Sequence, residues 1–297
     1  MNCPKCDCYI PPGTELCGCG YRITATENAA HAAPAAEPKP VIYPATKRII
    51  PYTIRGVSTR TAARITFLIF LALFILAWTQ KNRLPPRDRI LEQLLQQPQQ
   101  TKEDVPAPFT VQAKGISYRV TPQFRYELYG LVVSQHRSDS FIDIHHRDWQ
   151  DYLNLKDICV VWGSNITSGV YRRGKFWNRD FTCMCQFKDE LSFRLFSANE
   201  LSNNHLLSAD RAQRRLIKQI RRGDQIFFRG FLSSYEQPGN SFQRGTSVTR
   251  DDTGNGACET VFVTNLLILK RANTGWRILL ILAIGFMIFC VVVLFML

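Results

Sequence analysis

Two stretches of the chain are almost purely apolar, and they predict helices that span a membrane. Residues 278–297 carry no charge, and a helix of this length is ~30 Å long, which matches the hydrocarbon core of a bilayer. Residues 65–78 form a shorter apolar run, but Arg64 before it and the indole at its end are typical of the headgroup zone. We therefore expect transmembrane helices over residues 62–79 and 277–297.

The residues between the two predicted spans alternate between apolar and polar side chains, as β-strands do. Residues 116–120 and 126–134 have this period of two, and residues 157–163 (DICVVWG) form a short apolar run typical of a buried strand. Residues 181–187 and 260–269 predict two further strands. This part of the chain is therefore expected to be rich in β-structure.

One helix is clearly predicted within this β-rich region. Ser208 can cap its first turn, Leu216 belongs to its apolar face, and Gly223 follows its basic last turn. A helix that leads into a strand at residues 224–235 and then into a returning strand is typical of a small β-barrel. We predict an α+β fold class, mostly β, with a β-barrel-like soluble domain at residues 109–271 for which the oligonucleotide-binding (OB) barrel is one form.

Two linkers complete the predicted organisation. Residues 23–61 are rich in Ala and Pro and then in Lys and Arg, which predicts a disordered, basic linker. Residues 80–108 predict a break at two prolines, a short amphipathic helix over residues 87–97 and a second linker. The net charge is +13, and much of the excess lies beside the predicted spans, which suits anionic lipid headgroups at least as well as nucleic acid.

The first 22 residues contain two closely spaced cysteine pairs, which predict a metal site. Cys3 and Cys6 form the first pair, and Cys17 and Cys19 form the second. Four thiolates on tight turns coordinate Zn²⁺ tetrahedrally and leave no position for a substrate, so we expect a structural zinc ion and a protein partner for this zinc ribbon. Cys8 is an additional thiol that can replace Cys6 or Cys19. The alternative is a disulfide staple, which needs an oxidising compartment.

This segment resembles the short zinc ribbons at the N-termini of many prokaryotic membrane proteins, with Cys-Pro-x-Cys first and a Cys-Gly pair second. It departs from them in the one-residue spacing of its second pair and in the extra thiol. Residues 202–205 (SNNH) and 246–259 (TSVTRDDTGNGACE) resemble stretches of an uncharacterised group of bacterial membrane-anchored proteins. That resemblance implies a shared domain and no assigned activity.

Three polar clusters of the middle domain contain side chains suited to acid–base or metal chemistry. They lie at residues 136–151, 201–205 and 246–259. We favour a structural role for each of them, as surface loops, strand ends and Asx turns. If the clusters instead converge in space, the candidate catalytic residues are Asp143, His145, His146, His205, Asp251 and Asp252.

Four more cysteines lie in the β-rich domain. Cys183 and Cys185 are two residues apart in a predicted strand, so they point to the same face and are poorly placed to bond to each other. They can pair with Cys159 and Cys258 as two disulfides, form a second four-cysteine metal site, or remain reduced as small buried residues. The side of the membrane on which the domain lies decides between these states.

Two spans put both termini on one side of the membrane. Zinc ribbons need reduced thiols, so we expect a two-span protein of a bacterial inner membrane with cytoplasmic termini and a periplasmic middle domain. The basic residues beside the spans favour the opposite orientation when they are counted alone, but long domains translocate largely regardless of charge.

The sequence favours a non-enzymatic, membrane-anchored protein with a β-rich binding or assembly domain, because it has no recognisable catalytic constellation. Its expected partners are the lipid bilayer and a protein bound by the zinc ribbon. One alternative is a metal-dependent hydrolase or nuclease that uses the six candidate residues. The other is nucleic-acid binding by a cytoplasmic barrel, which requires surface aromatics at Tyr171, Phe176 and Trp177 beside the basic residues at 172–179.

Overall fold

The structure is a computed structural model that describes residues 2–11, 13–25, 53–54, 57–138, 147–179, 182–249, 252 and 258–297. It divides into two compact units, Met1–Pro51 and Tyr52–Leu297. In the first unit, isolated bridges join Asn2 to Tyr9 and Leu16 to Arg22 and close two small loops. Most of the predicted linker at residues 23–61 lies outside the described residues.

The second unit combines two long helices with a mixed α+β domain, as predicted. Its elements, in chain order, are β1 (Thr53–Ile54), β2 (Val57–Ser58), α2 (Thr59–Gln80), η1 (Arg87–Arg89), η2 (Glu92–Leu95), β3 (Gln99–Thr101), β4 (Phe109–Ala113), β5 (Ile116–His136), β6 (Asn154–Val161), α4 (Gly163–Thr167), η3 (Val170–Arg172), β7 (Lys175–Arg179), β8 (Thr182–Gln186), α5 (Glu190–Leu195), η4 (Ala198–Glu200), β9 (Leu201–Leu207), α6 (Arg211–Gln219), β10 (Gln225–Glu236), β11 (Gln243–Arg244), β12 (Cys258–Lys270) and α7 (Thr274–Met296).

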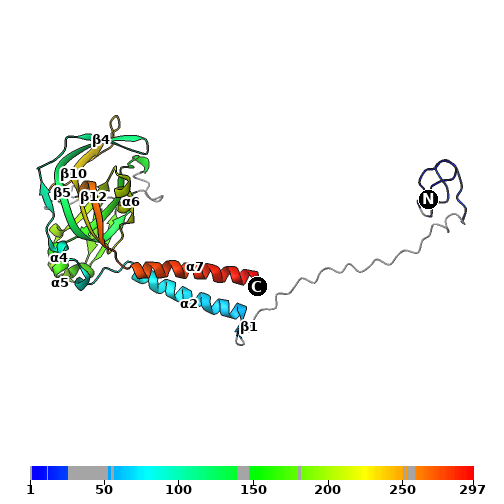
Figure 1. Ribbon diagram of the computed structural model, residues 1–297, viewed down its shortest axis with the longest axis horizontal. Coiled ribbons are helices and arrows are strands. Elements are labelled where there is room, and N and C mark those ends of the chain that lie inside the picture. The colour runs from blue at the N-terminus through cyan, green and yellow to red at the C-terminus, as the bar shows by residue number, and fades with distance from the viewer. Residues whose placement is uncertain are drawn as a thin grey trace. The chain divides into compact units, whose positions relative to one another are not determined.

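The helices α2 and α7 are long and apolar enough to cross a membrane. Each begins three residues before its predicted span, and Figure 1 shows them side by side, leaving the same end of the domain. The rings of Phe70 and Phe286 stack between them with centroids 4.3 Å apart. The Asn273 side chain, before α7, donates a hydrogen bond of 2.7 Å to the carbonyl of Arg83, after α2. The two helices therefore form an antiparallel hairpin.

The strands of the main sheet pair in a ring. β5 pairs antiparallel with β6, β6 with β9, and β10 with β12, while β9 and β12 run parallel. β10 then pairs with β5 along twelve residue positions, from Gln225 opposite Leu131 to Glu236 opposite Arg119. The hydrogen-bonded pairings thus return to the strand on which they begin.

The main hydrophobic core draws on all five strands of this ring and on α6. Trp162, at the end of β6, is fully buried in it, and its indole donates to Gln97. Ile217 and Ile220 contribute the buried side of α6. The cap of α6 differs from the prediction: Asp210 accepts from the Gln213 amide, whereas the Ser208 hydroxyl donates to the carbonyl of Val263.

Two segments differ from their predicted conformation. Residues 116–120 and 126–134 belong to one continuous strand, because Pro122 lies at an irregularity of the β5–β10 register and does not end the strand. Residues 87–97 form two 3₁₀ turns instead of an α-helix. The Leu91 amide between them donates to Gln225 of β10, and Leu94 is buried in a core cluster, so tertiary contacts replace the expected helical bonds.

Candidate functional site

The four predicted cysteine ligands of the N-terminal unit converge on one point. The Sγ atoms of Cys3, Cys6, Cys17 and Cys19 all lie within 4.8 Å of one another, close enough to hold a metal ion. Turns bring them together, since the Cys3 amide donates to the carbonyl of Cys8 and the Cys17 amide to the carbonyl of Tyr21. The sulfur of Cys8 is outside this group, so the substitute ligand that we considered is not needed.

The electrostatics of the cluster favour a cation. Burial opposes ionisation of Cys3, but the amides of Lys5 and Cys6 outweigh it and lower the pKa of the Cys3 thiol to about 7. The Cys8 amide favours the Cys6 thiolate, but the Cys19 thiol, burial and the other two thiols together outweigh it and raise the pKa of Cys6. A divalent cation removes this competition for negative charge, because it stabilises all four thiolates together.

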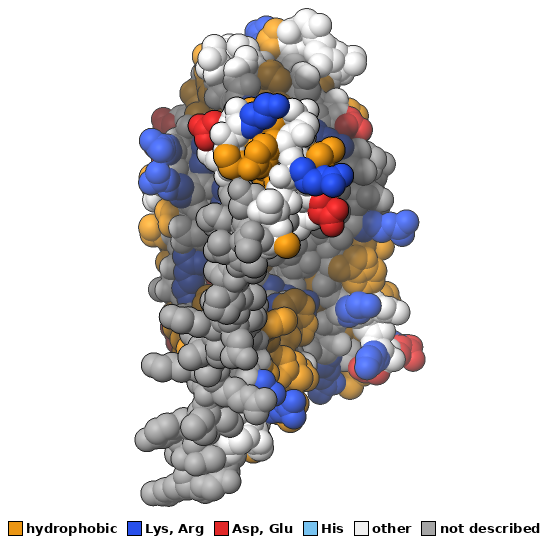
Figure 2. Space-filling view, turned by 90° about the vertical axis from the view of Figure 1, so that its right-hand side faces the viewer, with side chains coloured by type: hydrophobic (Ala, Val, Ile, Leu, Met, Phe, Trp, Pro, Cys, Tyr) orange, Lys and Arg blue, Asp and Glu red, His pale blue; other side chains and the backbone are white. Residues whose placement is uncertain are grey.

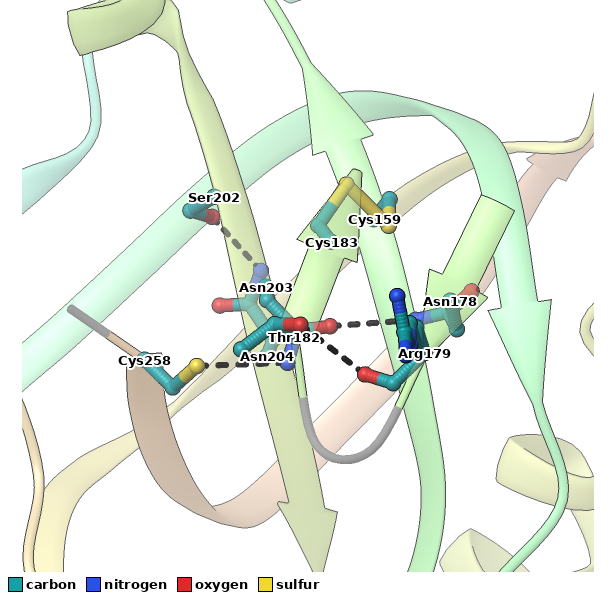
Figure 3. Close-up of a disulfide and its surroundings, with 9 residues drawn as sticks. All are labelled: Cys159, Asn178, Arg179, Thr182, Cys183, Ser202, Asn203, Asn204 and Cys258. Carbon is teal, nitrogen blue, oxygen red and sulfur yellow. Dashed lines mark hydrogen bonds between the residues drawn. A yellow bond between two sulfur atoms is a disulfide. The ribbon is translucent and has the colours of Figure 1, made fainter. Parts of the chain in front are cut away.

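The middle domain contains one disulfide, between Cys159 and Cys183, among its described residues (Figure 3). It fastens the β7–β8 hairpin to β6, while Cys185 and Cys258 are thiols. Of the alternatives that the sequence left open, the structure thus combines one pairing of Cys183 with Cys159 and two reduced cysteines. Cys258 of β12 lies opposite Asn203 of β9, and this strand lies between Cys258 and Cys159 on β6.

A buried ion pair lies on the same face of the ring. His205 of β9 faces Asp157 of β6, and the His205 Nδ1 and Asp157 Oδ1 atoms are 2.7 Å apart. Burial disfavours the imidazolium, but the carboxylate outweighs burial and raises the pKa of His205 to about 9. Burial likewise opposes ionisation of Asp157, but the charge and hydrogen bond of His205 hold the pKa of this carboxyl well below its usual range.

Arg244 joins this pair to the surface. Its Nη1 atom lies 3.2 Å from His205 Nδ1. Burial opposes the charge of the arginine, but the acidic groups around it, Asp151 and Asp157 among them, outweigh burial and raise its pKa. The Tyr235 hydroxyl donates to Asp151 at 2.6 Å. Arg244 also lines an open cavity of about 430 Å³. The residues around this cavity are Asp148, Trp149, Asn240, Ser241, Phe242, Gln243 and Arg244.

The six candidate catalytic residues have different outcomes. Asp143, His145, His146 and Asp251 lie outside the described residues. Asp252 accepts a hydrogen bond of 2.6 Å from the Ser247 hydroxyl within its own loop, and His205 is held by Asp157. Asp157, Arg244 and Tyr235 were not selected from the sequence, whereas Asp151 belongs to the polar cluster at residues 136–151. One sequence signal points to this site. Asp157 stands at the start of an apolar run, and a carboxylate that is buried in a strand needs a partner of opposite charge.

The aromatic set expected for a nucleic-acid surface is mostly buried. Tyr171 and Phe176 are 0% and 2% exposed and belong to a core cluster, and only Trp177 is partly exposed. The Tyr171 hydroxyl donates to the carbonyl of Pro85. In Figure 2, the basic side chains of the described residues in view are scattered among hydrophobic and acidic ones and do not gather into one patch. The predicted stacking surface is therefore wrong in two of its three aromatic residues.

Comparisons of the chain with protein-family models, with curated proteins and with solved structures found no match.

Proposed function

We propose that this chain is a membrane-anchored binding or assembly protein, with a zinc ribbon on one side of the membrane and an OB-type domain on the other. The observation that carries the proposal is the hairpin of α2 and α7, because large apolar side chains such as Leu68, Ile281 and Phe289 are more than half exposed on it. A water-soluble protein rarely exposes continuous apolar helices, whereas lipid chains cover them without cost.

The ring of strands supports the OB assignment. Numbered in chain order as strands one to five, β5, β6, β9, β10 and β12 pair in the order one, two, three, five, four and back to one. The third and fifth strands are parallel, and α6 lies between the third and the fourth. A five-stranded Greek-key ring of this kind is the architecture of OB barrels.

The chemistry of the N-terminal cluster supports zinc as its metal. Four thiolates within one small sphere are the ligand set of structural Zn²⁺ sites, and they leave no open position for a reacting molecule. Among its described residues, the small unit around the cluster has four buried side chains, Cys3, Ile10, Cys17 and Ile23. Its stability therefore depends on the metal, and its role is to bind a protein rather than to catalyse a reaction.

The cysteine chemistry of the two parts supports opposite compartments. The N-terminal cluster consists of four thiols, which persist in a reducing cytoplasm, and the middle domain holds the Cys159–Cys183 disulfide, which persists in an oxidising compartment. One span, α2, separates the N-terminal cluster from the domain, so the two parts can lie on opposite sides of the membrane. The second span, α7, returns the C-terminus to the side of the N-terminus. We therefore propose cytoplasmic termini and a periplasmic domain in a bacterial inner membrane.

The expected ligand of the domain is a protein or another extracytoplasmic molecule rather than nucleic acid. OB barrels bind nucleic acids on the outer face of their second and third strands, here β6 and β9. The β7–β8 hairpin covers part of that face through the disulfide and through a hydrogen bond of 3.1 Å from Asn178 to Asn203. The open cavity beside Arg244 and Trp149 is lined by the β5–β6 and β10–β11 connections and by β11, and it offers the domain an accessible site.

The described residues supply no metal site for the hydrolase alternative, because among them only the four N-terminal cysteines are placed to hold an ion. The buried pair of Asp157 and His205 is better suited to joining β6 and β9 inside the domain.

Alkaline extraction of membranes that contain the full chain tests the anchoring. We expect the protein to stay in the pellet, as an integral protein does, and to enter the supernatant only with detergent. Release by alkali alone would contradict the proposal.

A further inference from the structure

Four basic side chains gather where the helical hairpin joins the domain. Lys81 follows α2, Arg221 and Arg222 form the turn between α6 and β10, and Arg277 lies in the first turn of α7. We call these four residues the junction cluster. The charges of Arg277 and Arg221 act on Lys81 and, after burial itself, lower the pKa of its ammonium group. Three separate segments therefore bring like charges together.

Backbone contacts fix this arrangement. The Gly223 amide, next to Arg222, donates to the carbonyl of Val132 at 2.7 Å. The Asn273 side chain donates to the carbonyl of Lys81 at 3.2 Å. The Arg277 guanidinium reaches the carbonyl of Arg222 at 3.5 Å. Hydrogen bonds to backbone carbonyls thus hold the four cations close to one another.

The positive charge of the junction cluster is only partly balanced by the described part of the chain, where the Asp224 carboxylate acts on Arg277. No carboxylate there forms an ion pair with any of the four residues, and the nearby Asp224 is engaged by the amides of Arg221 and Ala272 and by Arg271 at 3.7 Å. The Nε atoms of Arg222 and Arg277 are enclosed and make no hydrogen bond. Burial alone lowers the pKa of Arg222. A partly buried guanidinium whose Nε has no hydrogen-bond acceptor is costly, which points to an anion outside the chain.

The position of the cluster identifies the anion. Lys81 Nζ lies 3.0 Å from the centroid of the Trp78 ring, at the end of α2, and Trp276 lies beside Arg277 at the start of α7. Tryptophans at the ends of spanning helices lie at headgroup depth, where phosphate groups are the available anions. Guanidinium groups bind phosphate oxygens well because they offer several N–H donors in one plane.

We propose that the junction cluster binds the phosphate of an anionic phospholipid headgroup in the leaflet that faces the domain. This site rests on the proposed membrane hairpin, but it adds a specific lipid class to it. It also explains why basic residues crowd the domain side of the spans against the positive-inside tendency. They serve as ligands for lipid and do not determine the orientation.

The test uses the full chain in detergent, titrated with short-chain phosphatidylglycerol and with phosphatidylcholine of the same chain length. Native mass spectrometry counts the bound lipids. We expect phosphatidylglycerol to bind about tenfold more tightly than phosphatidylcholine, and the double variant Lys81→Gln/Arg222→Gln to lose about tenfold in affinity for it. The single variant Arg222→Lys, which keeps the charge, should bind nearly as the wild type does.

A matched control removes two charges elsewhere. Lys114 lies in the turn between β4 and β5, and Arg119 pairs with Thr110 of β4. Figure 1 shows β4 at the end of the domain away from α2 and α7. Lys114→Gln/Arg119→Gln should therefore bind lipid as the wild type does. Equal binding of the two lipids, or equal loss in both double variants, would overturn the site. Displacement of phosphatidylglycerol by inorganic phosphate at equal concentration would assign the site to free phosphate and overturn the lipid claim. Alkaline extraction reports on the hairpin separately, so failure of the lipid site is distinguishable from failure of the anchor.

Discussion

Asp157 and His205 are 48 residues apart in the chain, yet the Asp157 carboxylate and the His205 imidazole lie 2.7 Å apart across two neighbouring strands. Both side chains are almost fully buried, at 2% and 3% exposure. Each buried charge is compensated by the opposite charge of its partner. Loss of either charge by titration therefore destabilises the domain, so its stability depends on pH.

The first prediction concerns this pH dependence. The folded pKa of His205, about 9, is above its unfolded value of roughly 6.5, so its contribution to stability is complete below about pH 6.5 and is lost as the pH rises through 9. The lowered pKa of Asp157 adds a contribution that is present above about pH 4 and lost in stronger acid. We expect the free energy of unfolding to fall by on the order of 2–3 kcal/mol between pH 6.5 and 9.

Chemical denaturation at several pH values, followed by the fluorescence of buried Trp162, measures this decline. His205→Gln should lower stability throughout and flatten the curve over that range, since glutamine does not titrate. A parallel decline in the variant and the wild type would show that another group is responsible.

The second prediction concerns the disulfide between β6 and β8. It closes a segment with a sequence separation of 24 residues, and the loss of such a crosslink costs about 3 kcal/mol of unfolding free energy. Cys159→Ala/Cys183→Ala should therefore unfold at lower denaturant concentration, and reductant should have no further effect on it. Cys185→Ala, two residues away in the same strand, is the control and should leave the stability unchanged. Equal effects of the two changes would contradict the crosslink.

The third prediction concerns the metal. Purified full chain should contain about one zinc ion per molecule by elemental analysis. Substituting Ser for Cys3, Cys6, Cys17 or Cys19 should remove most of it, because three thiolates bind zinc much more weakly than four. Cys8→Ser is the matched control, and it should retain the metal. Loss of zinc from the Cys8 variant alone would require a different ligand set.

The fourth prediction concerns Gly230, which lies at the register shift between β10 and β12. A Cβ atom there would overlap the carbonyl group of Phe262 in the neighbouring strand, and backbone cannot move aside easily. Gly230→Ala should cost about 2–4 kcal/mol of unfolding free energy. Gly245→Ala, where no atom lies near the added methyl group, should be close to neutral in the same denaturation assay. Similar stabilities of the two variants would contradict the close approach of the strands.

Local patterns predicted most elements of the domain. The alternation in residues 126–134, the apolar run at 157–163 and the amphipathic α6 all gave the correct type of structure, because the burial of each is set by the spacing of its own side chains. The cysteine cluster was also predictable, because its two pairs are close in the chain and short turns bring them together. The 3₁₀ turns at 87–95 were missed, since a contact with Gln225 far along the chain overrides local helical preference.

The candidate site was less predictable. Asp157, His205 and Arg244 come from three separate strands, and their proximity depends on the pairing of β6 with β9 and of β10 with β11. Likewise, the bond of Cys159 to Cys183 depends on how the β7–β8 hairpin folds back over β6. A single sequence carries no signal for such long-range pairings, so these contacts emerge only in three dimensions.

The membrane orientation is the central claim, and paired reporter fusions in a bacterial host test it most directly. Alkaline phosphatase, which is active only after export, and green fluorescent protein, which fluoresces in the cytoplasm, are each fused after residue 110 and after residue 297. We predict phosphatase activity at the first position and fluorescence at the second. Fluorescence after residue 110 with phosphatase activity after residue 297 would contradict the account and place the domain in the cytoplasm.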